Sequence, residues 1–394
     1  MRILTVGNMY PPHHLGGYEL MWRSAVTWLR DRGHEVRVLT TDYRAPEPDP
    51  STPQDEDVHR DLRWYWHDHS FPRLGPRAVA RLERHNARVL DHHLADLGPE
   101  AVSWWAMGGM SLSLIERTRR AGVAASCVVV DDWPLYGPRV DRRARFTRLP
   151  TRRKLARAGS WLFASNTLAE RARKGGWELA EARVAFPGID HALFCDPPPP
   201  RSEWAWRLLY CGRIDERKGI DLAVESLAYM PPGARLRVVG GGDEEHLSAL
   251  GALTDRLGLA GRVSFERRPR AELPSVYAEA DATLFPVRWA EPFGLVPLES
   301  MAMGTPAVAS GRGGSGEYLR DGENCVLFDA DLGGQGLADA VLRLAESPDE
   351  RGRIRRGGLE TSARFGEESF NQAVETSLLE AASSTRPRAS GRGH

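Results

Sequence analysis

Short apolar runs alternate with amphipathic segments along nearly the whole chain. In the first half, apolar runs of strand length lie at residues 2–6, 35–40, 101–105, 125–130 and 160–165. Between them, apolar residues recur at helical spacing, most clearly over residues 16–32 and 76–97. Because strands and helices alternate, this half predicts a mostly parallel sheet with helices packed on it.

The run Cys195-Asp-Pro-Pro-Pro-Pro200 interrupts this alternation, since consecutive prolines continue neither a helix nor a central strand. We interpret it as a link between domains. The alternation then restarts, with strands predicted at 207–211, 235–239, 262–265, 281–285, 306–309 and 325–328. The intervening helices are predicted at 218–228, 243–258, 271–279 and 295–303, followed by terminal helices at 334–346 and 348–381. The fold class is therefore α/β, with two Rossmann-like parallel-sheet domains.

Length and composition agree with two globular domains and exclude several classes of protein. The chain has 394 residues, for which two domains are the ordinary expectation. Lys plus Arg and Asp plus Glu both number 53, so the charge balance indicates no nucleic-acid partner. The four cysteines form no C-x-x-C pair, and no apolar run reaches membrane-spanning length. We therefore expect a cytoplasmic protein with reduced thiols.

The segment Glu291-Pro-Phe-Gly-Leu-Val-Pro-Leu-Glu299 carries the most chemical information. It follows a predicted strand and begins a predicted helix, a junction that lies at the ligand-binding edge of a parallel sheet. The amides of Gly294, Leu295 and Val296 would be free at the helix start and would favour a phosphate. Two glutamates beside a phosphate are suited to sugar hydroxyls, whereas the plainer interpretation is two solvated glutamates.

Two further segments have the character of phosphate sites. In Cys211-Gly-Arg-Ile-Asp-Glu-Arg-Lys-Gly219, Arg213 follows a strand and Lys218 precedes a helix, so both cations can point to the same edge. A solvated charge pair is the alternative. In Pro11-Pro-His-His-Leu-Gly-Gly17, the paired glycines allow close approach to a phosphate or simply form a turn. No G-x-G-x-x-G follows the first strand, so a nicotinamide or flavin site has no support.

Taken together and in this order, these segments resemble the retaining glycosyltransferases of family 4, which have the GT-B architecture. The resemblance covers nearly the whole chain. It extends to four further segments: Phe186-Pro-Gly-Ile-Asp190, Val239-Gly-Gly-Gly242, Gly304-Thr-Pro-Ala-Val308 and Gly313-Gly-Ser-Gly-Glu317. The resemblance implies two Rossmann-like domains that face each other across a cleft.

The resemblance also implies a role for each motif. The donor would be a nucleotide-diphosphate sugar, with Arg213 and Lys218 on the diphosphate, Glu299 on the ribose and Glu291 on the sugar. The implied donor-binding residues are Gly16, Gly17, Gly212, Arg213, Lys218, Gly294, Leu295, Val296 and Glu299. Fixed cations and amides would stabilise the departing diphosphate, so neither a cofactor nor a metal is expected.

One position departs from the family pattern. Many relatives carry a histidine after an N-domain strand, where this chain has Val129-Val-Asp-Asp-Trp133. Asp131 matches that histidine and would accept a hydrogen bond from a sugar hydroxyl or act as a base, unless it simply caps the next helix. The implied catalytic residues are Asp131, Arg213, Lys218 and Glu291. The candidate acceptor residues are His13, His14, Asp132 and Trp133.

The resemblance implies that residues 1–190 form an acceptor-binding domain and that residues 191–365 form a nucleotide-sugar-binding domain. It also implies a helix at 366–383 that packs back on the N-terminal domain. Residues 384–394 are predicted to be disordered.

The basic segment Arg139–Arg157 holds nine Arg or Lys and one acid. This charge favours peripheral contact with the inner face of a membrane, and the alternative is a solvated surface. His67, His69, His92 and His93 lack further ligands at regular spacing, so no metal site is predicted.

The sequence thus predicts a glycosyltransferase that moves a sugar to the hydroxyl of an acceptor. The acceptor would be a small molecule, such as a natural-product aglycone or aminocyclitol, or a lipid-linked envelope or polysaccharide precursor. The alternative is a nucleotide-sugar-binding GT-B protein without transfer activity. The base, the sugar and the oligomeric state leave no signature in the sequence.

Overall fold

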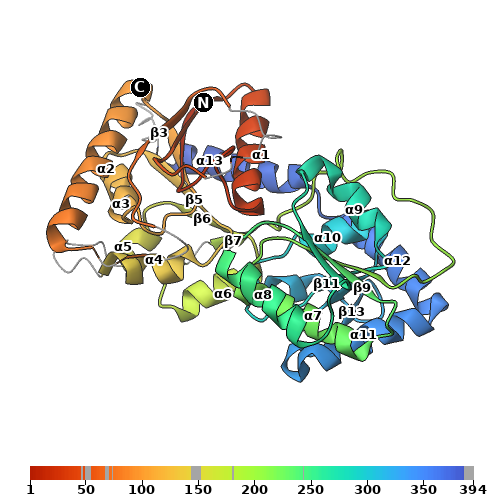
Figure 1. The fold of residues 1–394 in the computed structure, drawn as a ribbon. Helices are drawn as coiled ribbons and strands as arrows, with labels where there is room; N and C mark the ends of the chain where they lie inside the picture. Colours follow the sequence, from red (N-terminus) through yellow and green to blue (C-terminus); the bar gives the residue numbers. More distant parts are fainter. Residues whose placement is uncertain are drawn as a thin grey trace, which may run out of the picture. The chain divides into compact units, whose positions relative to one another are not determined.

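Two parallel β-sheets, each covered by helices, organise the computed structural model (Figure 1). The structure describes residues 1–45, 48, 55–66, 71–72, 74–142, 152–179, 182–242 and 244–385. The described chain divides into two units. The first contains residues 1–14 and 18–186 and the chain from 368 onward, and the second contains residues 15–17 and 187–367. The predicted α/β class with two Rossmann-like parallel sheets is confirmed.

The sheet of the first unit has the strand order β3-β2-β1-β4-β5-β6-β7, and every pairing is parallel. Its strands are β1 (Arg2–Val6), β2 (Glu35–Thr41), β3 (Val58–Leu62), β4 (Ala101–Trp104), β5 (Ala124–Val129), β6 (Ser160–Phe163) and β7 (Ala182–Val184). Its helices are α1 (Gly17–Asp31), α2 (Pro76–Leu97), α3 (Ser113–Arg120), α4 (Trp133–Arg142), α5 (Arg152–Ala156), α6 (Asn166–Lys174) and α13 (Glu367–Thr385). The edge strands β3 and β7 are additions to the predicted set.

The sheet of the second unit has the order β10-β9-β8-β11-β12-β13, again entirely parallel. Its strands are β8 (Arg207–Cys211), β9 (Arg235–Val239), β10 (Val263–Glu266), β11 (Ala282–Phe285), β12 (Ala307–Ala309) and β13 (Cys325–Leu327). Its α-helices are α7 (Ile220–Ser226), α8 (Glu244–Arg256), α9 (Leu273–Glu279), α10 (Val296–Ala302), α11 (Gly333–Glu346) and α12 (Pro348–Ser362). Short 3₁₀ turns lie at Glu216–Lys218, Leu227–Tyr229, Arg270–Glu272, Gly314–Glu317 and Ala330–Leu332.

Alternate residues of the β8 strand face two different cores. Leu208 and Tyr210 join the cluster that includes residues of α7, α8 and α11, while Leu209 and Cys211 join the cluster that includes residues of α9 and α10. The two-residue period of a strand therefore places helices on both faces of this sheet. In sheets of this kind, ligands generally bind at the edge formed by the loops that leave the strands at their carboxyl ends.

The long terminal helix predicted over 348–381 is instead two helices, α12 and α13. The chain between them pairs with the segment after Pro187, where the Ile189 amide donates to the Phe365 carbonyl and the Glu367 amide donates to the Ile189 carbonyl (2.9 and 3.0 Å). Phe365 also packs its ring near Phe293 and Tyr318. Backbone pairing and the packing of the partly buried Phe365 ring end α12 here, which the helical pattern of the sequence alone does not reveal.

Helix α13 packs on the first unit, where Phe370, Val374 and Leu378 are part of its core. Its Glu375 accepts a hydrogen bond from the Trp28 indole of α1 at 2.9 Å. The helix continues to Thr385, so the start of the predicted disordered tail is helical, and residues 386–394 lie outside the described residues. In the part of the chain that the structure describes, no helix has the length and apolar character needed to cross a membrane.

Candidate functional site

The loops after β8, β9, β11 and β12 gather at one edge of the second sheet, because these strands are parallel neighbours. The loop after β8 carries Arg213 and Lys218, and the loop after β11 carries Glu291. Close backbone packing joins the loops. Gly219 has φ +69°, and a Cβ there would lie 2.0 Å from the carbonyl oxygen of Pro286. A glycine at this position therefore brings the two motif-bearing loops into contact.

The Lys218 amine lies against the carboxylate of Glu291, with Nζ 3.1 Å from Oε1 and 2.8 Å from Oε2. The indole Nε1 of Trp289 donates to the same Oε2 at 2.7 Å. Both members of the ion pair are largely buried, with side-chain exposures of 18% and 10%. The pair therefore fixes a lysine cation and a carboxylate side by side at the sheet edge, each with little freedom to move.

A second loop holds the backbone of Glu291. Gly313 has φ +78°, and a Cβ there would lie 2.4 Å from both the amide nitrogen and the carbonyl oxygen of Glu291. The next residue, Gly314, donates its amide to that carbonyl at 2.6 Å. The Gly313-Gly-Ser-Gly-Glu317 motif therefore acts as a support for the backbone that carries Glu291.

Glu299 is buried in the first turn of α10 and is 6% exposed. The Tyr277 hydroxyl donates to its Oε2 at 2.7 Å, and Arg270 lies 3.6 Å from Oε1. The position near a helix N-terminus also favours a negative charge. Burial, together with the charge of Glu299, raises the pKa of the neighbouring Cys211 thiol to about 12, so this thiol remains protonated.

Arg213 is partly exposed at the same edge and is held by Asp215, whose Oδ2 lies 3.2 Å from an Arg213 nitrogen. Asp215 also binds Arg217 at 2.6 Å. Burial opposes ionisation of Asp215, but the hydrogen bond and charge of Arg217 and the charge of Arg213 lower its pKa well below the usual value. A permanently ionised Asp215 thus orients two arginines, and Arg213 presents a fixed guanidinium.

The start of α10 has no side-chain cap, since its N-cap is Leu295. Gly294, with φ +89°, turns the chain into the helix, and its carbonyl accepts from the Tyr318 hydroxyl at 2.5 Å. The amides of Leu295 and Val296 lie at this turn. Gly212 lies close by, since a Cβ added to it would be 3.8 Å from the side chain of Val296. The predicted donor residues of the second unit are therefore neighbours in space.

In the first unit, Asp131 follows β5 and begins the turn into α4. Its carboxylate accepts from the Trp133 amide and from the Tyr136 hydroxyl, both at 3.0 Å. Burial raises the pKa of Asp131 to about 6, although these two hydrogen bonds lower it. The neighbouring Asp132 binds Arg171 at 2.8 Å. Asp131 is thus a carboxylate that titrates close to neutrality, as acid–base chemistry requires.

The other predicted acceptor residues differ in accessibility. Trp133 is fully buried and packs its ring 5.5 Å from that of Trp161, so it is part of the core of the first unit. His13 and His14 are partly exposed. Burial and the nearby Arg60 lower the pKa of His13, which therefore is neutral at pH 7.

Residues 15–17 group with the second unit, and a Cβ on Gly17 would lie 3.9 Å from the side chain of Leu295. A Cβ on Gly16 would have no neighbour within 4 Å. The glycine loop therefore lies near the start of α10. Of the predicted basic segment Arg139–Arg157, residues 143–151 lie outside the described residues, as do His67 and His69.

Sequence reasoning missed the side chains that hold the motif residues: Asp215, Arg270, Tyr277 and Trp289. Two of them had a signal. Asp215 lies between Arg213 and Lys218, and Trp289 lies two residues before Glu291. Tyr277 and Arg270 come from α9 and the turn before it, so only the folded chain brings them to Glu299.

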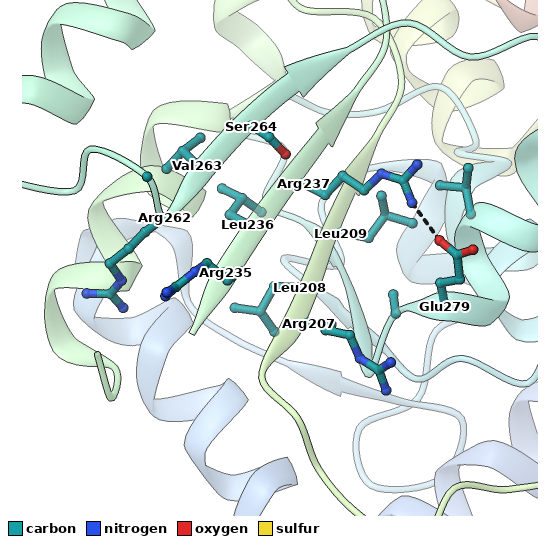
Figure 2. Close-up of a pocket in the computed structure, with 13 residues that line it drawn as sticks. Arg207, Leu208, Leu209, Arg235, Leu236, Arg237, Arg262, Val263, Ser264 and Glu279 are labelled. Atoms are coloured by element: carbon teal, nitrogen blue, oxygen red, sulfur yellow. Dashed lines mark hydrogen bonds and ion pairs between the residues drawn. The ribbon is translucent and has the colours of Figure 1, made fainter. Parts of the chain in front are cut away.

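A cavity of about 320 Å³ lies in the same unit but near the amino ends of the strands (Figure 2). Its lining includes Arg207, Arg235 and Arg262, which begin or precede strands β8, β9 and β10. Figure 2 shows Arg237 directed toward Glu279 of α9, with which it forms an ion pair at 2.8 Å. None of the motif residues lines this cavity, so the carboxyl-edge cluster remains the candidate site.

Comparison with known proteins supports this choice. The family model of glycosyl transferases group 1 matches residues 198–361, which contain both charged motifs. The glycogen synthase of Mycobacterium tuberculosis is 30% identical over 391 residues, spanning 88% of this chain and 87% of that protein. The D-inositol 3-phosphate glycosyltransferase of Xylanimonas cellulosilytica is 33% identical over 234 residues, or 54% of each chain.

Solved structures share the fold over almost the full length. Sucrose-phosphate synthase of Thermosynechococcus elongatus superposes with a TM-score of 0.76 at 18% identity, covering 98% of this chain and 100% of that chain. HepE of Anabaena in complex with UDP gives a TM-score of 0.73 at 20% identity, covering 96% and 100%.

Proposed function

Because the chain belongs to the group 1 glycosyl transferases of the GT-B superfamily, we propose that it moves a hexosyl group from a nucleotide-diphosphate sugar to an acceptor hydroxyl. The proposal rests on one arrangement above all, in which Arg213, Lys218 and Glu291 lie at the carboxyl edge of the second sheet. Two cations and a carboxylate there suit a diphosphate joined to a sugar.

The donor is held in three parts. Arg213 and Lys218 bind the diphosphate, with the amides of Leu295 and Val296 and the loop of Gly16 and Gly17 against the same group. Glu299 accepts hydrogen bonds from the ribose hydroxyls. Glu291 accepts hydrogen bonds from the hydroxyls of the sugar, and its ion pair with Lys218 holds its carboxylate in a fixed orientation. Gly212 and Gly294 leave space for close backbone approach.

The chemistry follows from the charges that develop. As the bond between the anomeric carbon and the diphosphate oxygen breaks, negative charge grows on the diphosphate, where Arg213 and Lys218 stabilise it. We propose transfer of the family 4 retaining type: the acceptor oxygen attacks on the face from which the diphosphate leaves. The acceptor proton then passes to a phosphate oxygen. The protein cations supply the stabilisation that a metal gives elsewhere, so the reaction is proposed to be metal-independent.

Asp131 is the proposed catalytic residue of the first unit. With a pKa of about 6 it is mostly ionised at pH 7 and accepts a hydrogen bond from a sugar hydroxyl. Asp132, His13 and His14 are partly exposed and are the candidates for contact with the acceptor, whereas Trp133 is buried in the core of the first unit.

The acceptor is proposed to be a hydroxyl of a cyclitol or a glycan, since the relatives that match are named for an inositol phosphate and for glycogen. A lipid-linked acceptor would call for peripheral membrane contact through the segment Arg139–Arg157. Co-sedimentation with anionic and neutral phospholipid vesicles separates these cases, because only a membrane-associated enzyme binds the anionic vesicles in a salt-dependent manner.

A thermal-shift panel of UDP, GDP, ADP and dTDP with their sugar conjugates, with and without EDTA, tests the donor site. One nucleotide should raise the melting temperature in both conditions by mass action. Incubation of that sugar conjugate with inositol phosphate and with glycan acceptors then tests transfer, and the anomeric configuration of the product tests retention. Binding without any transfer would favour the alternative, a nucleotide-sugar-binding protein.

A further inference from the structure

Three potential metal ligands meet between strand β3 and helix α2 of the first unit. His59 and Asp61 lie two residues apart on β3 and therefore point to the same face of the strand. His93 projects from α2, which packs on that face. One ligand atom from each of the three side chains lies within 4.8 Å of the others.

The carboxylate of Asp61 is the centre of this cluster. Its Oδ2 lies 3.2 Å from Nε2 of His93 and 3.8 Å from Nδ1 of His59. Zinc-type ions bind nitrogen and oxygen at about 2.0–2.2 Å, so two tetrahedral ligand atoms lie roughly 3.3 Å apart. The separation between Asp61 and His93 already matches this spacing, whereas His59 lies farther from Asp61 and would move slightly toward a bound ion.

Hydrogen bonding favours the tautomer of His59 that can bind a metal ion. Its Nε2 lies 2.7 Å from Oδ1 of Asp57, so in the neutral ring Nε2 carries the proton and donates it to that carboxylate. The lone pair then lies on Nδ1, directed at Asp61. A carboxylate that orients a histidine from behind is the usual outer partner of a metal ligand.

His93 differs from His59 in that its side chain is buried. It is 2% exposed, and its Nδ1 has no hydrogen-bond partner within the described chain. Its Nε2 lies 3.2 Å from Oδ2 of Asp61, so in the metal-free protein Nε2 carries the proton and donates it to that carboxylate. A metal ion would take the place of this proton at Nε2, and the neutral ring would then carry its proton on the unpaired Nδ1.

We propose that His59, Asp61 and His93 bind one divalent transition-metal ion of the zinc class. Two imidazoles and one carboxylate favour such an ion over Mg²⁺ or Ca²⁺, which prefer oxygen ligands. Asp61 is half-exposed, with 52% of its side chain accessible, so water completes the coordination. The ion would tie the edge strand β3 to α2 and stabilise the first unit. It plays no part in the proposed sugar transfer.

Calorimetric titration of the untagged full chain, stripped with EDTA and carrying Cys195→Ser, tests the site. This background removes the exposed thiol, which could bind zinc by itself. One Zn²⁺ should bind per chain and raise the melting temperature, whereas Mg²⁺ and Ca²⁺ should do neither. Co²⁺ should give the visible absorption bands of a protein-bound ion.

Three substitutions locate the ion. His59→Gln and Asp61→Asn, both at partly exposed side chains, should each weaken Zn²⁺ binding at least about 10-fold. His92→Gln, at an exposed neighbour on α2, should leave binding unchanged. Circular dichroism of the metal-free variants checks folding, so His59 and Asp61 decide the question even if a change of buried His93 unfolds the protein. No 1:1 binding, or binding that survives both ligand substitutions, would overturn the proposal and leave a hydrogen-bonded histidine–aspartate network.

Discussion

The amine of Lys218 lies 2.8 and 3.1 Å from the two carboxylate oxygens of Glu291, although 73 residues separate them in the chain. The pair forms because Gly219 and Pro286 pack their backbones together at the ends of β8 and β11. A lysine held in this way offers its charge to a diphosphate without first being ordered, which is how fixed groups lower a barrier.

Replacement of Lys218 by Ala should lower turnover roughly 100-fold or more, judging from the loss of one group that stabilises developing charge. The matched control is Lys174→Ala, which removes an exposed lysine at the end of α6. Steady-state kinetics with saturating donor measures the effect, and melting temperatures check folding. Turnover of Lys218→Ala close to that of the Lys174 variant would refute the diphosphate assignment.

Replacement of Glu299 by Gln should weaken nucleotide binding by roughly 10- to 100-fold, because hydrogen bonds to a charged group contribute about 1.5–3 kcal/mol. The side chain keeps its size and its place beside Tyr277, so the fold should be preserved. Glu279→Gln on α9 is the control, since this exposed residue binds only Arg237 among the described ion pairs. Equal nucleotide affinity in both variants, by calorimetry, would remove Glu299 from the donor site.

Gly313→Ala should destabilise the second unit and displace Glu291, since the added methyl group would meet the Glu291 backbone at 2.4 Å. Gly261 provides a close control. Its φ of +76° nearly equals the +78° of Gly313, yet a Cβ there would have no neighbour within 4 Å. Gly261→Ala should therefore cost only the left-handed backbone strain of about 1–2 kcal/mol. Chemical denaturation should give a larger loss for Gly313→Ala, and equal losses would contradict the supporting role of this loop.

The sequence was sufficient for most strands and for the motif-bearing loops, because buried parallel strands are short continuous apolar runs. It failed at β3, whose residues Val58-His-Arg-Asp-Leu62 are mostly polar at an edge of the sheet. With that strand missed, His59 and Asp61 could not be recognised as neighbours of His93. The break between α12 and α13 was missed for a related reason, since pairing with Ile189 is a contact between distant parts of the chain.

The function of Asp131 can be separated from its structural role. Asp131→Asn keeps an acceptor oxygen for Trp133 or Tyr136 but removes the charge, so we expect a large loss of kcat with nucleotide affinity little changed. Kinetics and nucleotide titration on the same preparation measure both quantities. A variant that loses only nucleotide affinity would assign Asp131 to donor binding, and one with wild-type kcat would exclude it from catalysis.

The stability of the same variant should depend on pH in a defined direction. The pKa of Asp131 is raised from 3.8 to about 6 in the folded chain, so between these values the folded state binds more protons than the unfolded state. The contribution of Asp131 to the free energy of unfolding therefore falls as pH rises from about 4 to 6, by up to about 3 kcal/mol, and is then constant.

Asn does not titrate, so the difference in unfolding free energy between Asp131→Asn and the wild type should shift in favour of the variant across this interval. Urea denaturation at pH 4.5, 6 and 7.5 measures it. Asp141 also titrates, with a pKa raised by burial to about 7, but it does so in both proteins and cancels in the difference. A difference that stays constant with pH would show that Asp131 has an ordinary pKa and would remove the basis for assigning it acid–base chemistry near neutrality.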